Sequence, residues 1–529
     1  MSNRDDAGLV GQSMMFRFPG PVFTDEARAV FAEIRPCGVL YFADNITSRE
    51  QVHALSTELQ AEAKRLGMPP LLIAIDQEGG IVSRFSPDMV TVPGAMALTA
   101  NGDSGDIRAS ARITGEQLAA VGINTDFAPV VDVNNNPLNP VIRTRSFGDT
   151  VERVNAGALA TIAGLTDAGI ISTVKHFPGH GDTAIDSHLG LPIIDHPRDR
   201  LDRIELAPFR AAIAAGVPAV MSSHILFPAL DQDPATLSHA ILTGVLRDDL
   251  GFEGVVFTDS LSMDAIEDRY GHGDAAVRCK LAGVDVLEAN ESIANQLTRF
   301  RALVEALEEG NIPRQVFAAT ASRIERLRER FAVGYGPRPL GDPDPSWSTE
   351  AQAIAVRTIA VLPPAGFKPI PRDEPVGFVD FQRLRASEAE DPFNRAGVFK
   401  NAITAALPAA RVVSIGHSPN AAEIERASRL AETVSTLVIM TRDATDNAYQ
   451  VDISREVLRN IEPGTRIVHV VLRGPYDRGV LGAVDATILT FGDPAVTLRA
   501  LASILAGSSP ITASLPVQLE ERIDGDGRP

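Results

Sequence analysis

Cysteine is scarce in this sequence, and long apolar runs are missing. The 529-residue chain has only Cys37 and Cys279, too few for a disulfide framework and without C-x-x-C spacing, so both are expected to be buried free thiols. No segment reaches the roughly 20 apolar residues of a membrane-spanning helix. The chain starts with an acidic stretch and no long apolar core, which predicts no signal peptide. Together these features predict a cytoplasmic protein.

Positive charge is also in the minority. The chain has 49 Lys and Arg against 68 Asp and Glu, which gives a formal net charge of −19 at pH 7. Because no Lys/Arg-rich run interrupts this balance, nucleic acid and an anionic membrane surface are poor partners on electrostatic grounds. A small neutral or locally bound ligand fits better. The sequence leaves the oligomeric state open.

Short apolar, β-rich runs recur through the first part of the chain, with helical patterns between them. The helical segments place apolar residues at three- and four-residue spacing and often end at glycine, as in 203–216. Continuous apolar strands with helical crossovers are typical of a parallel sheet. Eight such units suit a (β/α)8 TIM-type barrel over residues 1–333, with an open doubly wound sheet as the alternative. The eight expected strands lie at 10–16, 38–42, 71–76, 124–131, 171–177, 218–225, 254–259 and 284–289.

A Pro/Gly-rich stretch at 334–350 interrupts these patterns and is predicted to be an interdomain linker. Strand-like runs then begin again, separated by helical patterns such as 420–434. We therefore predict a second domain, an α/β sandwich with a parallel sheet, over residues 351–529. Its expected strands lie at 357–362, 374–381, 410–417, 436–442, 466–473 and 486–492.

Polar residues close several of the expected barrel strands. Asp76, the pair Lys175 and His176, His224 and Asp259 each stand at the end of an apolar run. A single polar residue at a strand end is usually a cap or a turn residue. Active sites of parallel barrels lie at the C-terminal ends of the strands, however, so several such residues on one rim predict a site.

The segment 175–192 combines histidines and acids with several glycines. A metal site could use His176, His180, Asp182, Asp186 and His188 as ligands. The intervening prolines and glycines break any helix, so the spacing does not favour metal binding, and no metal is predicted. Turn geometry accounts for most of these residues when each is considered alone. It does not explain Asp186 and His188 together, because a D-x-H pair can hold an imidazole in one tautomer and raise its pKa.

Four motifs now stand in order along the first domain: "DQEGG" at 76–80, "NPVIRTRSFGD" at 139–149, "KHFPGHGDTAIDSH" at 175–188 and "FTDSLSMDAI" at 257–266. This set resembles glycoside hydrolase family 3, specifically the NagZ-type β-N-acetylglucosaminidases. The second domain is similar to the α/β-sandwich domain of the family by pattern alone.

The resemblance implies a retaining exo-β-N-acetylglucosaminidase without metal or organic cofactor. By the motifs, Asp259 matches the nucleophile, His188 the acid/base and Asp186 the carboxylate paired with that histidine. The positions that match sugar-binding residues are Asp76, Arg84, Arg145, Lys175 and His176. The implied substrate is a small carbohydrate, a cell-wall-derived or chitin-derived fragment that ends in N-acetylglucosamine.

The chemistry of these residues agrees with the resemblance. A retaining glycosidase needs a carboxylate fixed below the sugar and a proton donor above it that later acts as base. Asp259 at a strand end supplies the first, and His188 suits the second because the ordinary pKa of histidine, about 6.5, lies near neutrality. A phosphorylase or β-glucosidase of the same family, a metal hydrolase and a non-catalytic sugar-binding protein are the alternatives.

Two residues depart from the family pattern. Arg143 stands where the family often has glycine, so an extra cation is expected at the rim of the sugar site, and Ser260 follows the nucleophile where many relatives have an acid. Aromatic platforms are also scarce, because Trp347 is the single tryptophan. This scarcity favours a short exo-acting pocket over a long polysaccharide cleft.

Overall fold

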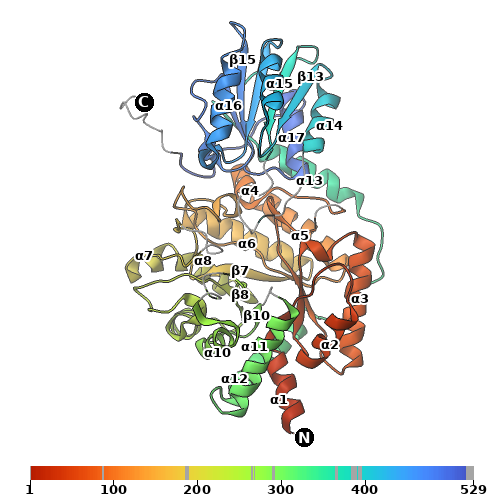
Figure 1. Cartoon of the computed structure of the whole chain (residues 1–529), viewed down its shortest axis with the longest axis vertical. Helices are drawn as coiled ribbons and strands as arrows, with labels where there is room; N and C mark the ends of the chain where they lie inside the picture. Colours follow the sequence, from red (N-terminus) through yellow and green to blue (C-terminus); the bar gives the residue numbers. More distant parts are fainter. Residues whose placement is uncertain are drawn as a thin grey trace.

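The computed structural model describes residues 2–85, 88–184, 190–263, 266, 269–288, 292–363, 367–382, 390 and 396–519. Two parts follow one another along the long axis of the molecule, with the N-terminal part in red to green and the C-terminal part in blue (Figure 1). Helix α1 lies at the end remote from the second part. In the described ranges no helix is both long enough and apolar enough to cross a membrane.

The first part is a parallel barrel. Within the described residues its sheet has eight strands in the order β10-β1-β2-β3-β6-β7-β8-β9, and all neighbours run parallel. A parallel bridge between Phe257 and Val286 joins the last strand to the first. This closure confirms the predicted barrel over the open sheet. The strands are β1 (Met14–Phe16), β2 (Gly38–Tyr41), β3 (Leu72–Ile75), β6 (Thr125–Asp126), β7 (Ile171–Phe177), β8 (Ala219–Ser222), β9 (Val255–Phe257) and β10 (Leu287–Glu288).

Helices surround the barrel, and side-chain caps begin several of them. The hydroxyls of Thr24, Ser48 and Thr150 each accept a hydrogen bond from a backbone N–H in the first turn of the helix that follows. The helices are α1 (Ser2–Gly11), α2 (Asp25–Ile34), α3 (Arg49–Arg65), α4 (Ala95–Asn101), α5 (Ser104–Ala120), α6 (Val151–Asp167), α7 (Arg198–Arg203), α8 (Leu206–Ala214), η4 (Ala240–Asp249, π-helical), α10 (His272–Ala282), α11 (Ile293–Glu308) and α12 (Arg314–Arg330).

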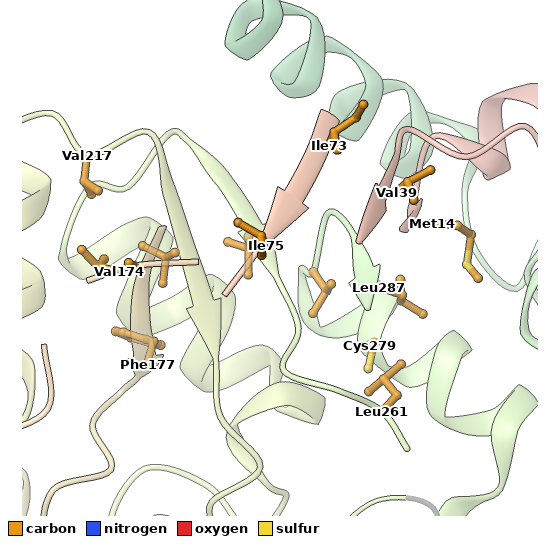
Figure 2. Close-up of a cluster of buried hydrophobic side chains, with 14 of the residues drawn as sticks. Met14, Val39, Ile73, Ile75, Val174, Phe177, Val217, Leu261, Cys279 and Leu287 are labelled. Carbon is orange, nitrogen blue, oxygen red and sulfur yellow. The ribbon is translucent and has the colours of Figure 1, made fainter. Parts of the chain in front are cut away.

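Alternate residues of the barrel strands face opposite sides, as the strand period requires. Met14, Val39 and Ile73 belong to the cluster shared with the surrounding helices (Figure 2). Their neighbours Met15 and Leu40 belong to a separate cluster inside the barrel. Both cysteines are buried and free, as predicted. The strand runs are continuously apolar because both of their faces are covered.

The second part is a three-layer α/β sandwich. Its described strands form one sheet in the order β11-β16-β15-β14-β12-β13. Helices α13, α14 and α17 share an apolar cluster on one face, while α15 and α16 share another on the opposite face. The elements are β11 (Ala360–Leu362), β12 (Val376–Phe381), β13 (Ala410–Ile415), β14 (Thr436–Thr441), β15 (Arg466–Val471), β16 (Ala486–Leu489), α13 (Pro345–Arg357), α14 (Ala396–Ala406), α15 (Ala421–Ala431), α16 (Ala448–Leu458) and α17 (Ala495–Leu505).

One feature of this sheet differs from the prediction of a purely parallel sheet. The three-residue strand β11 pairs antiparallel with β16, whereas the other pairs run parallel. The strand lies at the edge of the sheet, with a neighbour on one side. An edge strand can run either way without disturbing the crossovers of the interior, so the apolar run predicted its existence but not its direction.

The two parts meet through α13 and the connections around it. Residues 331–344 contain neither helix nor strand, and α13 begins at Pro345, inside the stretch predicted as linker. The indole N–H of Trp347 donates a 2.8 Å hydrogen bond to Glu116 of α5. Val92 and Ile113 of the barrel part pack in the same apolar cluster as α13. We propose that the domain boundary lies within 331–344.

Candidate active site

A pocket of about 300 Å³ opens at the C-terminal ends of the barrel strands. Six of the eight predicted site residues line it, while Asp186 and His188 lie outside the described residues. The predicted residues that line the pocket are Asp76, Arg84, Arg145, Lys175, His176 and Asp259. The others are Phe42, Glu78, Val82, Val141, His180, Met221, Ser260, Ser262, Met263 and Glu288.

Asp259 stands two residues beyond β9 and is half-buried in the pocket wall. Its backbone N–H donates to the carbonyl of Ser222 at 3.1 Å, which ties it to the end of β8. Its carboxylate accepts a 2.8 Å hydrogen bond from the backbone N–H of Ser260. The hydroxyl of Ser260 lies 2.7 Å from that of Ser262. Ser260 therefore contacts the Asp259 carboxylate through its main chain.

His224 was predicted at a strand end but is not among the residues that line the pocket. Its Nε2 lies 2.8 Å from the carbonyl oxygen of Ser260, and its Nδ1 lies 3.0 Å from the hydroxyl of Thr236. The imidazole is buried. It supports the backbone that follows Asp259.

Charged side chains form an ordered row along one wall of the pocket. The Lys175 ammonium lies 2.6 Å from Asp76 and 2.8 Å from Glu78. Arg145 donates two hydrogen bonds to the Glu78 carboxylate, at 2.9 and 2.8 Å. Arg84 lies 3.7 Å from the other oxygen of Asp76. Acids and bases thus alternate, and each cation of the row has an anionic neighbour.

This alternation governs the ionisation of the row. Burial favours the neutral form of Glu78, but Arg145 and Lys175 outweigh it and hold the pKa of that carboxyl well below its ordinary value. Burial acts against the charge of Lys175 as well, yet Asp76 and Glu78 raise its pKa. The same balance, with Glu78 as the main partner, raises the pKa of Arg145. Glu78, Lys175 and Arg145 therefore stay ionised across the physiological range.

Asp132 fixes the two histidines beside this row, one of which, His176, lies 3.4 Å from Arg145. Its Oδ2 lies 2.7 Å from Nδ1 of His176, and its Oδ1 accepts hydrogen bonds from the backbone N–H groups of His176 and His180, at 3.2 and 2.7 Å. The Nδ1 of His180 lies 2.9 Å from the hydroxyl of Thr183. Burial, followed by the neighbouring His176, lowers the pKa of His180 to about 4. His180 is therefore neutral at pH 7.

Sequence reasoning missed the carboxylates of Glu78 and Asp132, and also that of Glu288, which lines the pocket. Glu78 lies in the hairpin strand β4 (Gln77–Gly79), two residues after Asp76, so the strand period could have placed both side chains on one side. Asp132 directly follows the apolar run at 124–131. The rule that selected Asp76 and Asp259, a polar residue closing a barrel strand, would have selected Asp132 as well.

Arg143 does not recharge the rim of the pocket, so that expectation is wrong. Its guanidinium extends to the second domain, 2.5 Å from Asp446 and 3.4 Å from Asp443. Burial opposes its charge, but these two carboxylates outweigh burial and raise the pKa of Arg143. The residue has a φ of 40°, a left-handed conformation that suits glycine.

Among the described residues, no group of three or more His, Cys, Asp or Glu side chains is placed to hold a metal ion.

Comparison with known proteins defines the class. The glycosyl hydrolase family 3 N-terminal domain matches residues 10–327. The chain therefore belongs to glycoside hydrolase family 3, and it is a glycoside hydrolase.

Several relatives and solved structures are similar to this chain over most of its length. A beta-hexosaminidase A of Pseudoalteromonas piscicida is 32% identical over 540 residues, which covers 91% of this chain and 88% of that protein. The structure of a family 3 beta-N-acetylglucosaminidase from Paenibacillus sp. strain FPU-7 superposes with a TM-score of 0.92 at 36% identity, covering 97% of this chain and 98% of that one. A beta-glucoside phosphorylase, BglX, shares the fold at a TM-score of 0.79 and 20% identity, covering 97% of this chain and 94% of that one.

Proposed function

We propose that this chain is a retaining exo-β-N-acetylglucosaminidase, with Asp259 as nucleophile and His188, assisted by Asp186, as acid/base. The observation that carries the proposal is the placement of Asp259. It stands beyond β9, in a pocket that is also lined by the charged row of Asp76, Glu78, Arg84, Arg145 and Lys175. The relatives named beta-hexosaminidase and beta-N-acetylglucosaminidase support the choice of sugar.

In the first half-reaction the Asp259 carboxylate attacks the anomeric carbon, and a covalent glycosyl-enzyme forms. The bond from that carbon to the aglycone oxygen breaks as His188 gives its proton to the departing oxygen. In the second half-reaction neutral His188 removes a proton from water, which attacks the anomeric carbon and releases Asp259. Asp186 keeps the imidazole in the tautomer that both steps need.

The charged row suits a neutral, hydroxyl-rich substrate. Lys175 and Arg145 keep their protons and can donate to hydroxyl groups or to an acetamido carbonyl, while Asp76 accepts from hydroxyl groups. Because the cations are already matched by Asp76 and Glu78, binding a neutral sugar leaves no buried charge unpaired. Ionic substrates would disturb this balance.

The size of the pocket favours release of one terminal sugar at a time. Its volume of about 300 Å³ lies at the lower end of the roughly 300–1,000 Å³ usual for small-molecule sites. Phe42 supplies an aromatic ring to the wall, whereas Trp347 lies at the domain interface.

We infer that the substrates are small cell-wall-derived or chitin-derived fragments and that the protein has a cytoplasmic location. The net charge of −19 argues against a nucleic-acid partner.

Two nitrophenyl glycosides that differ only at C2 test the substrate. The acetamido sugar is expected to be hydrolysed with a far higher kcat/KM than its hydroxyl counterpart. A preference for the hydroxyl sugar would indicate a β-glucosidase, and binding without turnover would indicate a sugar-binding protein.

A second experiment tests the nucleophile. Asp259→Asn removes the attacking charge but keeps the shape, so turnover is expected to be nearly abolished while the protein stays folded. A fluorinated glycoside should label wild-type Asp259, as read by peptide mass spectrometry. Asp248→Asn, on an exposed carboxylate of η4, is the matched control and should keep full activity. Labelling elsewhere, or a product of inverted configuration, would overturn the covalent mechanism.

A further inference from the structure

The connection between β6 and α6 contacts two different surfaces within three residues. Residues Arg143–Arg145 form a 3-10 turn. Arg145 reaches into the pocket and binds Glu78, whereas Arg143 extends away from the pocket to Asp443 and Asp446 of the second domain. The turn therefore lies between the sugar site and the second domain.

The backbone at Arg143 is unfavourable for the residue that occupies it. A φ of 40° lies in the left-handed region, where side chains with a Cβ are disfavoured and glycine is not. The Arg143 side chain is 11% exposed and that of Asp443 is 3% exposed, so the ion pair between them is largely shielded from water, whereas Asp446 is 43% exposed. The electrostatic contribution of the pair with Asp443 is correspondingly less screened than that of a surface pair. The contacts of the side chain stabilise a turn that the backbone alone would disfavour.

The same connection also supports the chain that leads to residues 185–189. The Nε–H of Arg143 donates a 2.8 Å hydrogen bond to the carbonyl of Asn139. The amide nitrogen of Asn139 in turn donates to the carbonyls of His180 and Gly181, at 2.8 and 3.0 Å. A Cβ added at Gly181 would lie 1.7 Å from the carbonyl oxygen of Val133, so the two segments are in close contact. Movement at Arg143 would therefore reach both Arg145 and this segment.

One of the two acceptors on the second domain, Asp443, is held by further contacts. Asp443 accepts from the backbone N–H of Gly474 at 3.3 Å and lies 3.8 Å from the buried Arg473. A further contact between the domains is near by, because Asn134 donates a 2.7 Å hydrogen bond to the hydroxyl of Tyr476. The second domain thus offers a fixed surface against which the connection is placed.

We propose that Arg143 is a positioning residue through which the second domain holds the substrate-binding turn in place. The role assigned to Arg145 rests on the proposed function. In this arrangement the contact at Arg143 lets the second domain contribute to catalysis without itself touching the sugar. The docking of the two domains fixes the position of the Arg145 guanidinium. Loss of the contact loosens the turn, so sugar binding weakens.

Arg143→Gly tests the proposal cleanly, because glycine accepts the left-handed backbone and removes only the contacts. With a nitrophenyl N-acetylglucosaminide, KM is expected to rise on the order of fivefold to tenfold, the lower part of the range for coupled sites, with a smaller fall in kcat. Trp347 fluorescence reports the state of the domain interface independently, and it should match the wild type. Unchanged KM in Arg143→Gly would overturn the proposal.

Arg357→Ala is the matched control. Arg357 of α13 forms an ion pair between the domains with Asp106 of α5, at 2.6 Å, but neither residue lies in the connection that carries Arg145. The variant should keep the wild-type KM even if the domains separate more easily on heating. An equal rise of KM in Arg357→Ala and Arg143→Gly would show that docking in general matters and would refute a specific role for Arg143.

Charge exchange provides the rescue. Arg143→Asp places a third carboxylate beside Asp443 and Asp446 and should raise KM most, although aspartate tolerates a left-handed backbone. Adding Asp446→Arg restores an opposite charge and should recover part of the loss; no recovery would contradict the proposal. If the wild type hydrolyses no N-acetylglucosaminide, the proposed function fails. The positioning role is then read from binding of N-acetylglucosamine by calorimetry, in which Arg143→Gly should weaken affinity by a similar factor.

Discussion

Glu78 binds two buried cations, so replacing it with glutamine should have a large and pH-dependent effect. The carboxylate accepts two hydrogen bonds from Arg145 and lies 2.8 Å from Lys175. Glu78→Gln keeps the shape and one acceptor oxygen but removes the charge. Lys175 would retain Asp76 as its partner, whereas Arg145 would lose its bidentate acceptor.

The structure sets the size of the effect. The Glu78 side chain is 7% exposed and that of Arg145 is 5% exposed, so water can replace little of the lost interaction. Breaking such a buried pair by removing one partner typically costs about 3–5 kcal/mol. Because glutamine still accepts a hydrogen bond, we expect the low end, ~3 kcal/mol. At ~2 °C per kcal/mol for a large domain, the barrel transition in calorimetry should fall by about 6 °C.

The pH dependence follows from the pKa of Glu78, which is held below its ordinary value. A lowered pKa means that the carboxylate stabilises the fold above the unfolded-state pKa, about 4.3, and that this stabilisation is lost as the pH falls towards the folded-state pKa. The difference between wild type and Glu78→Gln should therefore be full at pH 7 and smaller below about pH 4. Equal differences at both pH values, or none at pH 7, would refute the reasoning. Glu58→Gln, on a carboxylate that is 45% exposed, is the control and should cost no more than about 1 kcal/mol.

Three further predictions concern the reaction. Asp132→Asn weakens the hydrogen bond to Nδ1 of His176 and should lower kcat/KM by roughly 10- to 100-fold, the worth of one hydrogen bond to a charged group; wild-type kinetics would contradict a role in orienting the ring. His188→Ala should slow the hydrolysis of substrates with poor leaving groups far more than that of nitrophenyl glycosides. Asp186→Asn should have a milder effect of the same kind, with a shifted pH profile. Equal slowing for all aglycones would exclude proton transfer by this pair. With millimolar phosphate present the product should remain free N-acetylglucosamine, because Arg143 is committed to the second domain; sugar 1-phosphate as the dominant product would make the enzyme a phosphorylase.

Much of the barrel could be predicted because its signals are local. The strands β1, β2, β3 and β6 to β10 all fall within the runs expected from apolar composition. Closure followed from the number of units, and convergence of Asp76, Lys175 and Asp259 followed from closure, since the C-terminal ends of parallel strands share one rim. The pocket residues that stand at strand ends could therefore be predicted, although the same rule also selected His224, which does not line the pocket.

Features set by contacts distant in the sequence could not be predicted. The direction of β11 depends on its pairing with β16, more than 100 residues later, and a three-residue apolar run is the same in either direction. The ion pairs of Glu78 could not be predicted for a similar reason. The environment of Glu78 is made by Arg145, from the connection between β6 and α6, and by Lys175, from strand β7. Composition predicts that charges are present but not which of them are paired.

Arg143 and Arg145 show this limit most directly, because two identical side chains in one motif reach different parts of the molecule. A run of R-T-R by itself gives no indication of which arginine lines the pocket, and both could have been surface charges. The left-handed backbone at Arg143 turns the chain so that the two side chains diverge, and carboxylates some 300 residues later provide the partners for one of them. The excess of acidic residues, from which a nucleic-acid partner was excluded, also includes Asp443 and Asp446, which bind Arg143 outside the pocket. A barrel expressed without the second domain would therefore leave Arg143 without Asp443 and Asp446 as partners.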